Sequence, residues 1–249
     1  MRRLRTVVAL AVGSGALAVP TASSAHSASS AAAVAPVTCD GKRATIIDRS
    51  PRANRIVGTP GRDVIVIAAG TGHDIVYGRG GDDVICGRAH TTVFGGRGDD
   101  RILYADRAYG GRGDDRMEDV DEAFGGKGDD VLLAAIFNET FAGGSGHDRV
   151  EFFSDSGLEG VSYSVRVDLA RGIAEVWADD APTRERLHLS SVEEVRGSGG
   201  DDVLLGDDRD NVLRGFSGDD VVDGRGGRDR VYGGTGTDVC TGEVLSGCP

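Results

Sequence analysis

The sequence predicts an all-β fold: a right-handed parallel β-roll, or β-helix, built from tandem nonapeptide repeats and interrupted by an irregular β insert. Three observations predict this fold. The nonapeptide G-G-x-G-x-D-x-U-x, in which U is a large apolar residue, recurs in register along the chain. The chain has 40 glycines, and a glycine in a helix interior costs about 1 kcal/mol relative to alanine. It has only 7 Phe, 5 Tyr and 1 Trp, too few large side chains for an ordinary globular core.

The first segment, residues 1–25, has the organisation of a secretory signal peptide. A basic start, Met1–Arg5, precedes an apolar stretch from Thr6 to Val19, and Ser23–Ala25 is a small-residue cleavage site. A membrane anchor is the alternative, but the apolar stretch is short for a bilayer, and no later segment approaches about 20 apolar residues. We therefore expect a secreted, extracellular chain with no membrane span, in which residues 26–38 form a disordered lead-in.

The charge balance bears on the partners. The chain has 40 Asp and Glu against 28 Lys and Arg, a formal net charge of −12. An acidic surface of this kind disfavours nucleic acids and anionic membranes, and it favours cations. Metal ions are therefore the first partners to consider.

The four cysteines imply two disulfides in an exported chain. The sequence alone permits three pairings. Cys240 and Cys248 are close together near the C-terminus, Cys39 opens the ordered region and Cys86 ends an early repeat, so we favour Cys39–Cys86 and Cys240–Cys248. A zinc site is the alternative, but no C-x-x-C spacing supports it.

The repeats fall into two blocks, residues 58–150 and 197–241, on either side of the insert at 151–196. The second block has five contiguous units, and the first is less regular. The sixth position of each unit is an Asp, with one Asn as the exception. The candidate metal ligands are Asp63, Asp74, Asp83, Asp100, Asp115, Asp130, Asp148, Asp202, Asn211, Asp220, Asp229 and Asp238.

The spacing of these residues suits calcium bound between stacked turns. Positions one to six form a turn in which glycines adopt backbone angles closed to residues with a Cβ. Positions seven to nine form a short strand whose eighth side chain points inward, and coils of eighteen residues stack ~4.8 Å apart. Calcium takes about six to eight oxygen ligands at about 2.4 Å, so one ion can reach carboxylates and carbonyls of two turns. The sequence therefore predicts bound Ca2+.

The spacing also predicts where the metal lies and what its removal does. The acids from Asp100 to Asp148 recur at intervals near one full coil, so we expect metal mainly on one face there and on both faces in the second block. Without metal, two carboxylates ~5 Å apart repel by roughly 3 kcal/mol at an effective dielectric of 20. We expect a loosened metal-free chain that gains β-structure when calcium binds.

The runs Gly-Gly-Arg-Gly-Asp-Asp at 95–100 and 110–115 and Gly-Gly-Lys-Gly-Asp-Asp at 125–130 resemble hemolysin-type calcium-binding (RTX) repeats. The resemblance covers roughly residues 55–150 and 197–241. It implies that sixth-position residues and turn carbonyls of units two apart share each ion. The implied pairs are Asp202 with Asp220, Asn211 with Asp229, Asp220 with Asp238, Asp100 with Asp115, Asp115 with Asp130, and Asp130 with Asp148.

The two ends of the chain are similar to small secreted calcium-binding proteins built around such repeats. Many RTX toxins use an uncleaved C-terminal export signal, whereas this chain has an N-terminal one. The resemblance implies that residues 39–57 cap one end of the roll. It also implies that a disulfide-closed segment, residues 242–249, covers the other end and blocks edge-to-edge aggregation.

The insert predicts paired strands, because polar and apolar residues alternate over 161–169 and 172–177. We expect a β-hairpin excursion or widened coils. The sequence contains no nucleophile elbow, H-E-x-x-H helix or phosphate-binding loop. Glu151, Asp155 and Asp168 could form a glycosidase-type carboxylate pair, but scattered acids are expected in so acidic a chain. We therefore expect no catalytic residues and no enzyme, and we interpret His188 as a surface or strand residue.

Phe94, Tyr109 and Phe124 each precede a Gly-Gly pair and should stack as a ladder. Cross-strand packing is favoured over a sugar-binding platform as their role. The expected function is calcium binding by a secreted protein with a structural or interaction role, whose partner is an extracellular polymer or a cell surface. The alternatives are a hydrolase or carbohydrate-acting enzyme with a β-helical body, and an adhesin that uses the roll as a spacer.

Overall fold

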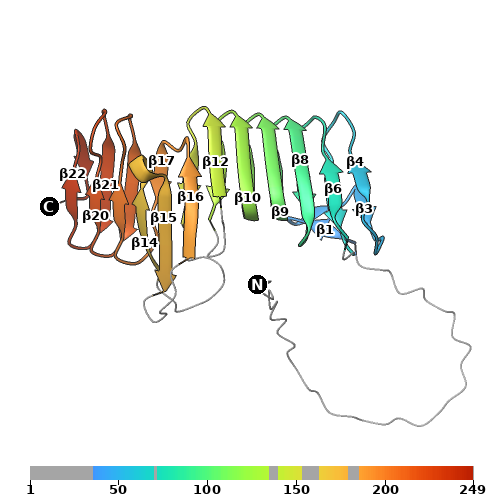
Figure 1. Ribbon diagram of the computed structural model, residues 1–249, viewed down its shortest axis with the longest axis horizontal. Coiled ribbons are helices and arrows are strands. Elements are labelled where there is room, and N and C mark those ends of the chain that lie inside the picture. The colour runs from blue at the N-terminus through green and yellow to red at the C-terminus, as the bar shows by residue number, and fades with distance from the viewer. Residues whose placement is uncertain (1–35, 70–71, 135–139, 153–162, 179–184, 249) are drawn as a thin grey trace, which may run out of the picture. The chain divides into compact units, whose positions relative to one another are not determined.

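The computed structural model describes residues 36–69, 72–134, 140–152, 163–178 and 185–248, so the predicted signal peptide lies outside the described residues. Within them, a short 3-10 turn, η1 (Leu169–Arg171), accompanies an otherwise all-β chain. The strands stack as a β-solenoid, side by side from β3 to β22 (Figure 1). This confirms the predicted fold class. No helix in the described ranges is long and apolar enough to cross a membrane.

One side of the solenoid, face 1, is a parallel sheet of mostly three-residue strands. Each strand pairs with the strand one coil further along, as β5 does with β7 and β11 with β13. The strands of face 1 are β3 (Ile46–Asp48), β5 (Val64–Ile67), β7 (Val84–Cys86), the first parts of β9 (Arg101–Arg112) and β10 (Arg116–Lys127), β11 (Val131–Leu133), β13 (Arg149–Glu151), β17 (Glu194–Arg196), β19 (Val212–Ser217), β21 (Arg230–Thr235) and β23 (Val244–Ser246).

The opposite side, face 2, is parallel except where the insert enters it. The turns that lead into face 1 are called edge 1, and those that lead into face 2 are called edge 2. The strands of face 2 are β4 (Arg55–Val57), β6 (Asp74–Tyr77), β8 (Thr91–Arg97), the last parts of β9 and β10, β12 (Thr140–Ser145), β16 (Glu185–Ser190), β15 (Ile173–Ala178), β14 (Tyr163–Asp168), β18 (Val203–Leu205), β20 (Val221–Asp223) and β22 (Val239–Thr241).

The insert lies within face 2 rather than projecting from it. β16 pairs in parallel with β12, β15 pairs antiparallel with β16 and β14, and β14 pairs in parallel with β18. The antiparallel pairing was expected from the alternation of polar and apolar residues. Its place was not, because an excursion or a widened coil was expected. In-sheet pairing satisfies the backbone groups that a hairpin projecting from the solenoid would leave to water.

The core consists of two facing columns of single apolar side chains. In a strand, successive side chains point to opposite faces, so the eighth position of each unit points inward. Eleven of the twelve residues predicted there are 0% exposed, and Cys240 is partly buried at the end of the column. The eleven are Ile65, Val76, Ile85, Ile102, Met117, Leu132, Val150, Leu204, Leu213, Val222 and Val231.

The structure contains two disulfides with the pairing that the sequence favoured, Cys39–Cys86 and Cys240–Cys248. The N-terminal segment is divided. Its first part, β1 (Thr38–Cys39) and β2 (Lys42–Arg43), forms a hairpin whose Cys39 packs among outward apolar residues of face 1 such as Val64 and Val84. Only residues from Ile46 onward form the first coil, because β3 pairs with β5.

An aromatic stack runs along the outside of face 2. Phe94, Tyr109 and Phe124 stack with ring centroids 4.8 Å apart, as predicted, and Tyr77 extends the stack at 5.1 Å from Phe94. The interplanar angles are 6–9°, so both faces of Phe94 and Tyr109, and one face each of Tyr77 and Phe124, are turned toward a neighbouring ring. Sugars bind aromatic rings through their faces, and this arrangement therefore favours the packing role.

Candidate metal sites between stacked turns

Glycines at the second and fourth positions shape the four turns of edge 1 between residues 95 and 148. In the turn before Asp115, Gly111 and Gly113 have φ of 121° and 119°, in the region that side chains disfavour. A Cβ on Gly113 would collide with the backbone of Gly98 in the turn below. The repeated glycines thus let adjacent turns approach closely enough to share a ligand.

The sixth-position side chains form ladders that connect successive turns. In eight pairs, the main-chain N–H of one residue donates to Oδ1 of its counterpart in the next coil, at 2.8–3.0 Å. The pairs are Asp63/Asp83, Asp83/Asp100, Asp100/Asp115, Asp115/Asp130, Asp130/Asp148, Asn211/Asp229, Asp202/Asp220 and Asp220/Asp238. The first six pairs lie on edge 1 and the last two on edge 2, which includes every pair implied by the resemblance.

The second carboxylate oxygen of each ladder step is buried without a partner. In all eight pairs, Oδ2 of the residue in the later coil has no hydrogen-bond partner and no exposure. These residues are Asp83, Asp100, Asp115, Asp130, Asp148, Asp220, Asp229 and Asp238. A buried charged oxygen without a partner is costly, so this pattern requires a cation or a proton at each of these oxygens.

Main-chain carbonyls face the same space. A Cβ built on the first glycine of a turn would collide with Oδ2 of the sixth residue, as at Gly95 with Asp100, and would lie 2.7 Å from the carbonyl oxygen of Gly110 in the next coil. No group of three or more His, Cys, Asp or Glu side chains able to hold a metal occurs in the described ranges. A metal here therefore needs carbonyl ligands, and calcium accepts such a mixed oxygen set. The residues fit the ion.

Burial raises the pKa of the ladder carboxyls. The pKa of Asp115 is raised to about 8, and those of Asp100, Asp130 and Asp220 to about 7. Desolvation is the largest cause, and neighbouring ladder carboxylates add repulsion. Hydrogen bonds from the backbone oppose the shift only in part. Without metal, these carboxyls therefore titrate near neutral pH, well above their ordinary pKa of 3.8.

Three turns at the start of a ladder differ from the turns that follow. In each, the N–H of the second residue donates to an oxygen of the sixth side chain: Thr59 to Asp63, Ser198 to Asp202, and Asp207 to Asn211. The second residue of these turns does not have the positive φ that the second residue of the following turns adopts, whether that residue is a glycine, as at Gly96, or not, as at Arg79 and Phe216. The first turn of each of these ladders is therefore held by a hydrogen bond within the turn, between its second and sixth residues.

Asp74 is not part of a ladder. It lies on edge 2, where its Oδ1 accepts the N–H of Asn54 and its own N–H donates to the carbonyl oxygen of His90. No sixth-position acid is paired with it among the described residues. Its predicted role as a metal ligand therefore has less geometric support than that of the other eleven residues.

Sequence reasoning missed a second row of aspartates, at position five. The N–H of Asp99 donates to Asp82 Oδ1, that of Asp114 to Asp99 and that of Asp129 to Asp114, at 2.8–3.1 Å. These side chains are more exposed than the sixth-position row. The repeated Gly-Asp-Asp run was the available signal, but only its second Asp was assigned a role.

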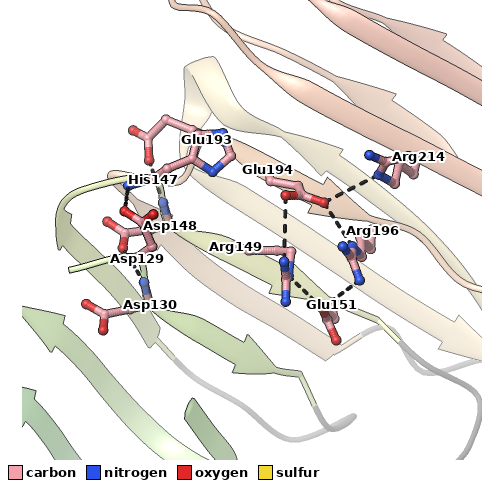
Figure 2. A network of polar contacts seen from close by, with 10 residues as sticks. All are labelled: Asp129, Asp130, His147, Asp148, Arg149, Glu151, Glu193, Glu194, Arg196 and Arg214. Atoms are coloured by element: carbon pink, nitrogen blue, oxygen red, sulfur yellow. Dashed lines mark hydrogen bonds and ion pairs between the residues drawn. The ribbon is translucent and has the colours of Figure 1, made fainter. Parts of the chain in front are cut away.

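Two glutamates that sequence reasoning missed continue the ladder of edge 1. The Asp148 N–H donates to Glu193 Oε2 at 3.0 Å, and the Asp229 N–H donates to Glu243 Oε2 at 2.7 Å. Both glutamates sit in turns shorter than six residues. Their additional methylene group lets a carboxylate reach the same N–H from a more distant backbone. Figure 2 shows Glu193 beside Asp148.

The acids once considered as a catalytic pair are held in ion pairs. Glu151, which is 3% exposed, lies 3.1 Å from Arg196 and also contacts Arg149 (Figure 2). Asp168 accepts hydrogen bonds from Arg225, which lowers its pKa. Asp155 lies outside the described residues. Glu151 and Asp168 are thus each engaged with arginine side chains.

Together, the stacked glycine turns and buried carboxylates define a parallel β-solenoid with acidic inter-turn sites. Comparison with family models gives a match to the RTX calcium-binding nonapeptide repeat (4 copies) at residues 66–89, 103–118, 117–150, 196–231 and 215–243. The chain is therefore built around RTX calcium-binding nonapeptide repeats. Comparison with curated proteins gives no match.

Proposed function

We propose that the protein is a secreted calcium-binding protein with a structural or interaction role and no catalytic activity. The observation that carries the proposal is the row of eight buried Oδ2 atoms without partners, one in each turn that follows the first turn of its ladder. Each faces the carbonyl-lined space between two turns, where a divalent cation would be shared by both coils. The ions would then join coils that otherwise have only a thin core.

Secretion is supported by the disulfides and by the N-terminal sequence rather than by the fold. The described chain contains two disulfides, and disulfides persist in oxidising environments outside the cytosol. The basic and apolar start of the sequence adds a candidate signal peptide. Extracellular calcium modules often bind with dissociation constants of about 0.1–1 mM, and we propose affinities in that range.

The proposed lack of catalysis rests on the fate of the candidate acids. Glu151 and Asp168 are paired with arginines, and His188 is exposed on β16 at the outer surface of face 2. We therefore propose that the solenoid presents an extended surface to an extracellular polymer or a cell surface. Turnover of a polysaccharide or lipid that is lost in Glu151→Gln or Asp168→Asn would contradict this part of the proposal.

The decisive experiment is a calcium titration of the oxidised chain from residue 26 onward. Isothermal titration calorimetry should give several ions per chain, and circular dichroism should show β-structure gained as they bind. Magnesium is the matched control, because it demands near-octahedral geometry and gives up its water reluctantly, so it should neither bind nor fold the chain at equal concentration. A chain that gives no calcium heat and keeps its spectrum in chelator would refute the proposal.

A further inference from the structure

The C-terminal residues form a final half-coil that the disulfide closes. After β22, the chain turns within two residues, Gly242 and Glu243, and β23 pairs in parallel with β21. Gly247 and Cys248 follow, and Cys248 is bonded to Cys240 of β22. The loop 240–248 thus returns to the strand from which it started.

On edge 1, this loop supplies a carboxylate to the last ladder aspartate. Glu243 Oε2 accepts the Asp229 N–H at 2.7 Å, as ladder aspartates do elsewhere through Oδ1 at 2.8–3.0 Å. Asp229 is 0% exposed, and its Oδ2 has no hydrogen-bond partner. Glu243 therefore occupies the place of the sixth-position residue of a further turn.

On edge 2, the same loop supplies a carbonyl oxygen. A Cβ built on Gly233 would collide with Gly247 O and lie 2.5 Å from Asp238 Oδ2. One coil earlier, a Cβ on Gly215 would meet Gly233 O at 2.6 Å and collide with Asp220 Oδ2. Gly247 O thus stands to Asp238 as Gly233 O stands to Asp220. Asp238 Oδ2 is likewise buried without a partner.

We infer that the disulfide-closed loop 240–248 completes the last calcium site on each edge, with the Glu243 carboxylate on edge 1 and the Gly247 carbonyl on edge 2. The inference rests on the proposed calcium binding and deepens it, because it makes the two terminal sites depend on the Cys240–Cys248 bond. The bond holds Cys248, and with it the adjacent Gly247, against β22. Reduction releases this constraint and therefore weakens both sites.

The test uses calcium titration of the oxidised chain from residue 26 onward. Glu243→Gln keeps the size of the side chain and an oxygen but removes the charge, and it should weaken one site by at least about tenfold, since ligand charge tunes calcium affinity. The double variant Cys240→Ser/Cys248→Ser should lose or weaken two sites. The matched controls are Ser246→Ala, an exposed side chain in the same loop, and Cys39→Ser/Cys86→Ser, which removes the other disulfide. Both controls should retain the two C-terminal sites.

A second readout follows from the reciprocity of linked equilibria. At a calcium concentration that saturates the unchanged chain, we expect the equilibrium constant for reduction of Cys240–Cys248 in a thiol redox buffer to be about tenfold larger in Glu243→Gln, with Cys39–Cys86 unaffected, as measured at equilibrium by alkylation and peptide mass spectrometry. If the unchanged chain binds calcium but both C-terminal variants keep its stoichiometry and affinities, the inference is wrong while the proposed function stands. If the unchanged chain binds no calcium, both are wrong.

Discussion

Two neighbouring aspartates, Asp115 and Asp114, allow a buried candidate metal ligand to be compared with an exposed acid when each is replaced by asparagine. Asp115 is 1% exposed, and it belongs to two ladder steps, since its N–H donates to Asp130 and its Oδ1 accepts from Asp100. Asp114 precedes it in the exposed row at position five. Asp115→Asn and Asp114→Asn preserve the Oδ1 acceptor in each case. Only the first removes a buried charge.

The expected effects of Asp115→Asn have opposite signs with and without metal. A site occupied at ten times its dissociation constant adds about 1.4 kcal/mol to the free energy of unfolding. Loss of the two sites that share Asp115 should therefore remove about 2.8 kcal/mol of calcium-dependent stability. Without metal, burial raises the pKa of Asp115 to about 8, so its ionised form opposes folding at alkaline pH. The neutral amide relieves this cost and should stabilise the metal-free chain.

Thermal and denaturant unfolding, followed by circular dichroism at pH 8 with calcium and with chelator, measures both effects. Asp114→Asn should change each free energy of unfolding by less than about 0.5 kcal/mol, as substitutions at exposed positions usually do. Equal losses of calcium response in the two variants would refute the reasoning. So would an Asp115→Asn protein that loses stability in chelator and keeps its full response to calcium.

Three further predictions concern pH, the N-terminal disulfide and the aromatic stack. The pKa values of the ladder carboxyls in the folded chain lie near 6–8, above the ordinary value of 3.8, so the metal-free chain should lose stability as pH rises from 4 to 8. Calcium affinity should instead fall on acidification, because protons compete for the same carboxylates. Unfolding and calcium titrations across this pH range measure both trends, and the opposite trend in either one would contradict the prediction. Removing the Cys39–Cys86 disulfide, which spans 47 residues, should lower the free energy of unfolding by about 4 kcal/mol in the chain-entropy model. The loss should be confined to the first coils, since each coil contacts only its neighbours. Unchanged hydrogen exchange in these coils would contradict this prediction. Phe94→Ala should lower the free energy of unfolding by about 1–3 kcal/mol beyond the loss from burial, since Phe94 stacks on two rings. Thr92→Ala, on the same strand, should lower it by less. Equal unfolding midpoints for the two variants would exclude a packing role for the stack.

Much of this architecture could be predicted because the repeat encodes it locally. A nine-residue unit with an apolar eighth position fixes which side chains point inward, and the glycines fix where the chain turns. The register of the sixth-position acids then follows from the length of a coil, and Asp100, Asp115 and Asp130 lie in successive turns as their spacing indicated. Cysteine positions at the two ends were sufficient to favour the observed pairs.

The remaining features depend on contacts that no local pattern records. The insert joins face 2 because β16 finds a parallel partner in β12 and β14 finds one in β18, pairings set by the coils on either side. The hairpin at Cys39 lies on the outer surface of face 1, where Val64 and Val84 point outward and would otherwise be exposed. The insert strands cover strand edges and the hairpin covers an apolar surface, and both the edges and the surface are formed only when the coils stack.

Glu193 and Glu243 also could not be predicted from the local pattern, for a reason that lies in the length of their turns and side chains. A search for Asp at a fixed spacing passes over Glu193 and Glu243, because their turns are shorter than the repeat. In space, the shorter turn and the longer side chain compensate for each other, so the carboxylate reaches the next N–H. Ladder position is therefore a property of the stacked backbone, and a spacing rule finds only the turns of standard length.

Comparison of two buried acids, Glu194 on face 1 and Asp115 on edge 1, supports a role for a cation from solution at the ladders. Glu194 is 8% exposed and burial opposes its ionisation, but hydrogen bonding to Arg196 and the charges of Arg149 and Arg214 outweigh burial and lower its pKa (Figure 2). Asp115 is buried at least as deeply, has no arginine among the chief influences on its pKa, and shifts in the opposite direction. Where the chain supplies its own cations, the buried carboxylate is ionised. Where it does not, a regularly spaced row of carboxyls has raised pKa values, and a cation bound between the turns would take the place of the protons on this row.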